Sequence, residues 1–99
     1  MADRTDFLRT REARVASIEL GSNETLPWHC HTELLERIVC LSGRIEVHSQ
    51  NPDSVDILQP GEMAEVQAHR VHRLVNSLSL PSACLLVQSG AYDFIPIDA

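Results

Sequence analysis

The chain has 99 residues, of which 43% are hydrophobic and 22% charged, and it contains no lysine. This length predicts one globular domain, residues 1–99, near the size at which a single core is just sufficient. The formal net charge of -6 argues against a nucleic-acid partner, and the lack of lysine excludes Schiff-base chemistry.

The N-terminal segment, residues 1–14, is rich in arginine and is expected to form an N-terminal arm with a solvated surface. It holds four of the eight arginines, Arg4, Arg9, Arg11 and Arg14. The alternative is a basic arm that meets an acidic partner. Because this segment is charged where a secretory signal is apolar, and no apolar run has the length of a membrane span, we expect a cytoplasmic protein without a membrane partner.

Short β-branched or alternating segments follow, separated by Pro, Gly, Asn, Asp and Ser. In chain order they cover residues 13–20, 36–41, 44–49, 55–58, 62–67, 72–78, 83–88 and 94–97. Residues 34–38 could instead form a helical turn, but this stretch is too short for a stable helix and continues into a strand-like run. Closely spaced strands without helices predict an all-β sandwich or barrel.

Histidines and cysteines are the residues of this sequence best suited to metal binding or catalysis. His29 and His31 are two residues apart, so in a strand they share a face while Cys30 points the other way. His69 and His72 follow some forty residues later and could complete a metal site. The three cysteines are odd in number and lack a CxxC pair, so we expect buried thiols and not a disulfide framework.

Two motifs resemble the signatures of the cupin superfamily. In residues 21–43, H-x-H is followed by Glu and then Gly at the family's spacing, as His29, His31, Glu36 and Gly43. In residues 61–76, the second signature matches at Gly61, His72 and Asn76. It departs at Gln67, where Pro is usual, and at His69, where Gly is usual, which removes a rigid turn and a flexible glycine.

The resemblance implies a double-stranded β-helix, a jelly roll with a metal inside. It also implies a ligand set of His29, His31, Glu36 and His72 around a divalent transition metal, Fe, Mn, Zn, Ni or Cu. Simple strand alternation would favour Glu33 over Glu36, so the chain must bend or bulge at residues 32–35, and Glu33 is expected at the rim. The alternative is that these polar side chains lie on a solvated loop or are hydrogen-bonded without a metal.

Other pocket candidates follow from strand alternation. Ile38 and Cys40 share the face of Glu36, and Arg70, Leu74 and Asn76 share that of His72. Arg70 could bind a substrate carboxylate and His69 could carry a proton, which makes them the candidate catalytic residues; the alternatives are a surface arginine and a loop histidine. The remaining candidates are Cys40 as a substrate-facing thiol or core residue, Gln67 and Tyr92 as hydrogen-bonding groups, and His48 as turn surface.

Three functions are compatible with this pattern. The first is a metal-dependent enzyme acting on a small molecule, of the dioxygenase, isomerase, decarboxylase or lyase type. The second is a non-catalytic module that binds a metal or metabolite, and the third is a structural cupin with vestigial ligands.

Unpaired sheet edges and the apolar runs at 38–41 and 83–87 further predict a homodimer.

Overall fold

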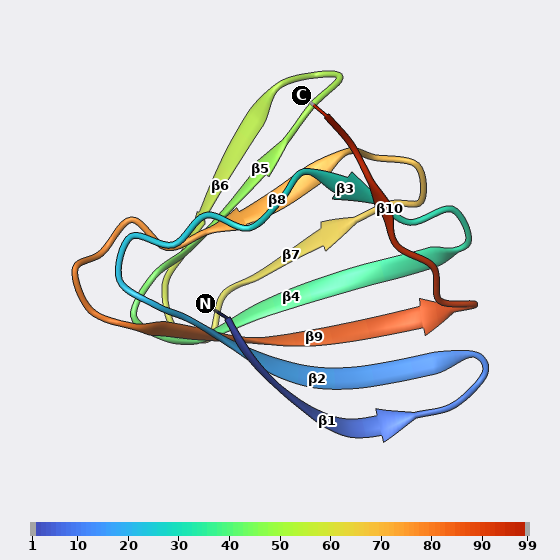
Figure 1. Cartoon of the computed structure of the whole chain (residues 1–99), viewed down its shortest axis with the longest axis horizontal. Coiled ribbons are helices and arrows are strands. Elements are labelled where there is room, and N and C mark those ends of the chain that lie inside the picture. Colours follow the sequence, from blue (N-terminus) through green and yellow to red (C-terminus); the bar gives the residue numbers. More distant parts are fainter. Residues whose placement is uncertain (1, 99) are drawn as a thin grey trace.

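The computed structural model describes residues 2–98, which form ten β-strands in two five-stranded antiparallel sheets (Figure 1). The first sheet has the order β1 (Asp3–Arg9), β2 (Ala13–Leu20), β9 (Ser82–Gly90), β4 (Leu34–Ser42) and β7 (Met63–Val66). The second has the order β10 (Ile95–Pro96), β3 (His29–Cys30), β8 (His72–Val75), β5 (Ile45–Ser49) and β6 (Ser54–Leu58). The expected all-β jelly roll is confirmed. Within residues 2–98, no helix could cross a membrane.

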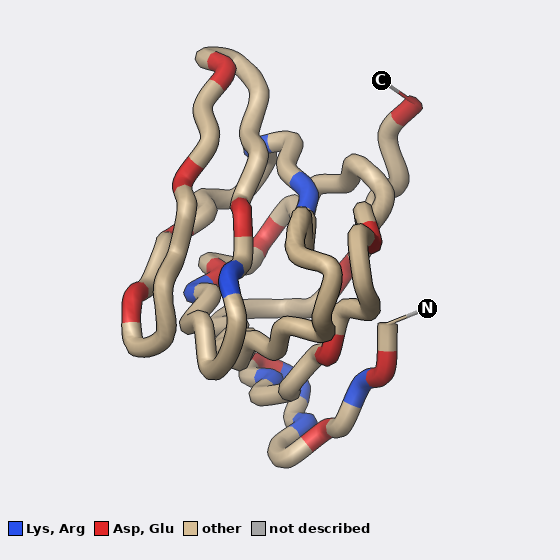
Figure 2. Tube along the Cα trace, turned by 90° about the vertical axis from the view of Figure 1, so that its left-hand side faces the viewer, with Lys and Arg blue, Asp and Glu red and all other residues tan. Residues whose placement is uncertain are grey.

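The expected N-terminal arm is part of the first sheet. Residues 3–9 form β1, which pairs antiparallel with β2, and all seven of its residues are exposed. Acidic and basic residues are interleaved along this hairpin (Figure 2). The segment is therefore an edge strand of the barrel and not a free extension.

Strand alternation places the core between the two sheets. In β4 the buried positions are Leu34, Glu36, Ile38 and Cys40, which confirms that Ile38 and Cys40 share the face of Glu36. The helical alternative for residues 34–38 is wrong, because β4 covers them. The core cluster also contains Ile18, Leu20, Ile45, Val47, Leu58, Ala64, Val66, Leu74, Cys84 and Leu86.

A bend between β3 and β4 aligns the two halves of the first motif. Residues 32 and 33 are bent, so β4 restarts the alternation at Leu34 and brings Glu36 inward. Glu33 is exposed, in agreement with its expected place at the rim. The odd separation between His31 and Glu36 therefore does not put them on opposite faces.

Gly43 and Asn76, two motif residues that are not ligand candidates, have structural roles. Gly43 has a φ of 70°, and a Cβ built there would lie 2.1 Å from Ser82 Oγ. Asn76 is fully buried; its amide donates to the main-chain oxygens of Gly21 (2.8 Å) and Leu80 (2.9 Å), and its Oδ1 accepts from Ser82 Oγ (3.0 Å). Asn76 thereby joins the end of β8 to the start of β9, and Gly43 packs against the same Ser82.

Candidate metal centre

The candidate centre is built from two cross-strand pairs that face each other across the barrel. In the second sheet His29 lies opposite His72, and in the first sheet Glu36 lies opposite Gln88. His31 follows β3 directly. One donor atom from each of His29, His31, Glu36 and His72, hereafter the His/Glu cluster, lies within 4.8 Å of the others, and all four residues are buried.

All three imidazoles of the cluster are oriented by main-chain carbonyls. Each ring uses its Nδ1, at 3.0 Å for His29 and 2.9 Å for His72. The carbonyls belong to Pro27 for His29, to Asp93 for His31 and to Arg70 for His72. Because a carbonyl oxygen only accepts, each Nδ1 carries a proton, and Nε2 is the nitrogen left for a ligand at the centre.

The contacts of Glu36 require a cation at the centre. His72 Nε2 lies 3.0 Å from Glu36 Oε1, and His31 Nε2 lies 3.5 Å from Glu36 Oε2. With Nδ1 protonated, a neutral imidazole presents a lone pair at Nε2, which would face another lone pair on the carboxylate. Among residues 2–98, His31 Nε2 also has no hydrogen-bond partner. Either protons or a metal ion must compensate, so this donor set fits a divalent transition metal.

Burial and the carboxylate shift the pKa values within the cluster in different directions. Burial lowers the pKa of His29 to about 4. Burial also acts to lower the pKa of His31, but the Glu36 carboxylate and the Asp93 carbonyl outweigh it and raise the pKa. For Glu36, burial acts to raise the pKa, but the imidazoles and Gln88 outweigh it and hold the pKa well below its usual value. Glu36 is therefore an ionised carboxylate although it is only 2% exposed.

Gln88 holds Glu36 in place and was missed by the sequence interpretation. Its Nε2 donates to Glu36 Oε2. Because an ionised carboxylate only accepts, this contact also fixes which amide atom is the oxygen, and Oε1 has no partner among residues 2–98. Alternation in β9 could have indicated that Gln88 faces inward, because Cys84 and Leu86 precede it on the buried face.

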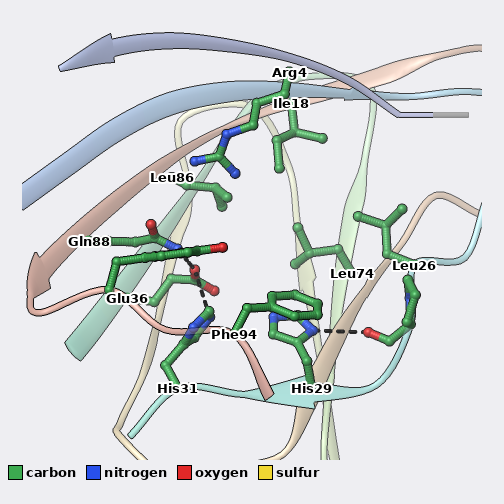
Figure 3. A pocket seen from close by; sticks show the side chains of 12 residues that line it. Arg4, Ile18, Leu26, His29, His31, Glu36, Leu74, Leu86, Gln88 and Phe94 are labelled. Carbon is green, nitrogen blue, oxygen red and sulfur yellow. Dashed lines mark hydrogen bonds and ion pairs between the residues drawn. The ribbon is translucent and has the colours of Figure 1, made fainter. Parts of the chain in front are cut away.

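A cavity of about 190 Å³ opens above the cluster (Figure 3). Its walls are mainly apolar, and their aliphatic residues are Ile18, Leu26, Pro27, Leu74 and Leu86. Of the cluster, His29, His31 and Glu36 reach the cavity. At about 30 Å³ per water molecule in the liquid, the cavity has the volume of about six water molecules, so it has room for a small molecule.

Residues of both terminal segments line this cavity. The sequence analysis did not predict that Arg4 or Phe94 would do so. Arg4 extends into it from β1, and Phe94 stacks on His29 with ring centroids 4.5 Å apart and planes at 16° (Figure 3). Tyr92 also lines the cavity, in agreement with its candidacy as a pocket residue, although no hydrogen bond of its hydroxyl is seen within residues 2–98. Its ring is covered by the guanidinium of Arg14 at 3.6 Å.

The structure does not bring the two candidate catalytic residues into the cavity. Arg70 turns away, and its guanidinium donates to the main-chain oxygens of Asn51 and Pro52 and to Ser54 Oγ. His69 is exposed, and its main-chain N–H donates to the carbonyl of His31 at 2.7 Å. Its φ of 69° shows that histidine adopts the left-handed conformation for which the motif normally uses glycine.

The remaining candidates have structural positions. Cys40 is fully buried in the core, and burial raises its pKa, so it is not a substrate-facing thiol. Gln67 is exposed, and its carbonyl accepts from the Arg70 N–H at 3.3 Å. The interpretation of His48 as turn surface is wrong, because it lies in β5, half-buried, 2.9 Å from Glu46 Oε1.

Comparison with known proteins supports the fold. A family model described as a cupin domain matches residues 16–89. An uncharacterised protein with a double-stranded β-helix domain from Klebsiella pneumoniae aligns with a TM-score of 0.86 and 22% identity, over 99% of this chain and 85% of that chain. No curated protein matches.

Two further structural neighbours differ in function. An oxalate oxidase solved with glycolate aligns with a TM-score of 0.83 and 13% identity, over 95% of this chain but only 54% of that chain. A cupin domain from an XRE family transcriptional regulator of Enterobacter cloacae aligns with a TM-score of 0.80 and 18% identity, over 92% of this chain and 98% of that one. At these identities the likeness establishes the fold alone.

Proposed function

The chain belongs to the cupin domain family, and we propose that it holds one divalent transition metal at the His/Glu cluster and acts on a small molecule as a metal-dependent enzyme. The observation that carries the metal proposal is the set of three Nδ1-anchored imidazoles whose Nε2 atoms meet a buried, ionised carboxylate. Fe, Mn, Zn, Ni and Cu are all compatible with nitrogen and carboxylate ligands.

A bound metal of this kind supplies a Lewis acid for a substrate oxygen and, if it is redox-active, a centre for reaction with O2. The chain's own residues would provide the setting. Gln88 holds the Glu36 carboxylate, Phe94 covers His29, and the walls of the cavity are mainly apolar. This arrangement suits dioxygenase, isomerase, decarboxylase or lyase chemistry.

Metal content tests the first half of the proposal. Purified protein reloaded separately with each metal and freed of excess should retain about one ion per chain. His72→Ala and His29→Ala should lose it, because either change leaves an incomplete ligand set. His48→Ala is the matched control and should retain the metal, and circular dichroism should show that all variants fold. Full metal content in both cluster variants would refute the ligand assignment.

The second candidate function is a non-catalytic module that binds a metal or metabolite. It is supported by the likeness to the regulator's cupin domain and by the position of His69 and Arg70 outside the cavity. Metal-loaded protein should be incubated with O2 and a panel of 1,3-diketones, thiols, small keto acids and uronates. Product formation that is lost in His72→Ala supports the enzyme, whereas tight binding without turnover supports the module.

We also propose that two copies associate in solution. Large apolar side chains are exposed on two of the four edge strands, Phe7 and Leu8 on β1 and Val55 and Ile57 on β6. Strands at a sheet edge can pair with a second copy or be covered by it. A monomeric mass by light scattering across a wide concentration range would refute the dimer.

The cytoplasmic location stays a prediction that cell fractionation would test.

A further inference from the structure

Arg4 is the cation of the cavity, in a protein whose overall charge is negative. Its guanidinium points into the cavity from β1, on the opposite side from His29 and His31 (Figure 3). The Arg4 side chain is 32% exposed, and its Nε donates to Asp6 Oδ1 at 2.8 Å. No hydrogen bond of its two terminal nitrogens is seen within residues 2–98, so the half of the guanidinium suited to a bidentate contact remains available.

A simple surface ion pair accounts for only part of this arrangement. An exposed pair such as Arg4 with Asp6 contributes little to stability. The pair does, however, hold the guanidinium in an orientation in which its two terminal nitrogens remain available to a ligand. Asp6 lies on the exposed β1, and it does not line the cavity.

The groups at the two ends of the cavity favour an anion. A divalent metal with Glu36 as its one carboxylate ligand would carry a net single positive charge. At the opposite end Arg4, which shares its charge with Asp6 outside the cavity, presents the terminal nitrogens of its guanidinium. Between them lie the side chains of Ile18, Leu74 and Leu86, which offer no hydrogen bonds. The cavity volume of about 190 Å³ restricts the occupant to a small molecule.

We infer that the cavity takes a small carboxylic acid that carries a second oxygen group, with the carboxylate on Arg4 and the second group directed to the His/Glu cluster. This inference rests on the proposed function, because it uses the metal as the partner of the second group. Arg4 is thereby a specificity-determining residue, and the apolar walls set the length and bulk of the carbon chain between the two oxygen groups.

Paired ligands that differ in one charge test this inference. Succinate, glutarate and adipate, each with its monoamide, are titrated calorimetrically into metal-loaded wild type, Arg4→Gln, Arg4→Lys and the control Arg9→Gln. The three lengths sample the unknown span between Arg4 and the cluster. Arg9 lies on the same strand, is exposed and does not line the cavity. Metal content and thermal unfolding are measured on the same samples.

Wild type and Arg9→Gln should bind at least one diacid about tenfold or more tightly than its monoamide, as expected for loss of a charge-assisted hydrogen bond. Arg4→Gln should lose this preference with unchanged metal content, and Arg4→Lys should keep only part of it, because lysine lacks the planar fork.

Equal preference in wild type and Arg4→Gln, or no binding of any diacid by metal-loaded wild type, would overturn the inference alone. If wild type takes up no metal, the proposed function fails separately. The same titrations of the metal-free protein then test the role of Arg4. A preference for the diacid over its monoamide that is lost in Arg4→Gln supports this role, and an equal preference in wild type and Arg4→Gln overturns it.

Discussion

Acidification should destabilise the metal-free protein through His29. This imidazole is 8% exposed, and burial lowers its pKa from 6.5 to about 4. Between pH 6.5 and 4 the unfolded chain therefore binds a proton at this residue that the folded chain does not. The free energy of unfolding then decreases as the pH falls through this window.

The expected size follows from these two pKa values. Between pH 6.0 and 5.0, the His29 equilibrium reduces the free energy of unfolding by about 1 kcal/mol. His31 acts in the opposite sense, but its raised pKa means that its stabilising contribution is lost above pH 6.5 and is nearly complete below pH 6. Glu36, with its lowered pKa, contributes stability that is lost only below about pH 4.5. The chosen window therefore isolates His29.

Urea unfolding of chelator-treated protein at pH 6.0 and 5.0 measures this effect. Wild type is compared with His29→Gln, which keeps a polar side chain but does not titrate, and with His69→Gln, which removes an exposed histidine outside the cavity. The wild type and His69→Gln should lose about 1 kcal/mol, and His29→Gln clearly less. Equal losses in wild type and His29→Gln would show that the imidazole is not held neutral by burial.

Substitutions at three positions test the structural residues around the site, each by urea unfolding. Gly43→Ala should cost about 2 kcal/mol or more, because the positive φ and the contact with Ser82 both disfavour a Cβ; a cost below about 0.5 kcal/mol, as is usual for an unconstrained surface position, would contradict this reasoning. Asn76→Ala should cost about 3 kcal/mol, because it leaves buried carbonyls without donors, and a neutral result would mean that water replaces the amide. His69→Gly should be about 1 kcal/mol more stable than His69→Ala, because only glycine is unstrained at a φ of 69°, and equal stabilities would refute the strain.

The spacing of the two cupin-like motifs indicated the four residues of the candidate centre, and strand alternation predicted that His29 and His31 share a face. His29 and His31 face inward together, and Glu36 joins them after the predicted bend at residues 32–35. Alternation failed at Arg70, which is two residues before His72 but lies outside β8 in the preceding loop. There the main chain does not repeat every two residues, and three acceptors in residues 51–54 draw the guanidinium outward.

The cavity walls were less predictable than the cluster. Arg4 and Phe94 reach the cavity only because β1 pairs with β2 and β10 pairs with β3. The first pairing is a hairpin between neighbouring segments, whereas the second joins segments far apart in the sequence. Both terminal strands are exposed, so they lack the apolar alternation that marks an inward face. For Gln88, strand alternation was sufficient to predict a side chain that faces inward. Its contact with Glu36 could not be predicted, because it depends on the pairing that places Glu36 opposite.

The anchoring of the imidazoles through main-chain carbonyls has an evolutionary consequence. Positions 27, 70 and 93 hold the rings by atoms that every amino acid possesses. Their side chains can therefore drift while the donor geometry persists, provided that the backbone path is retained. Related chains can then share this centre with few identical residues beyond the ligands themselves, and divergence at those three positions would carry no information about whether a metal is bound.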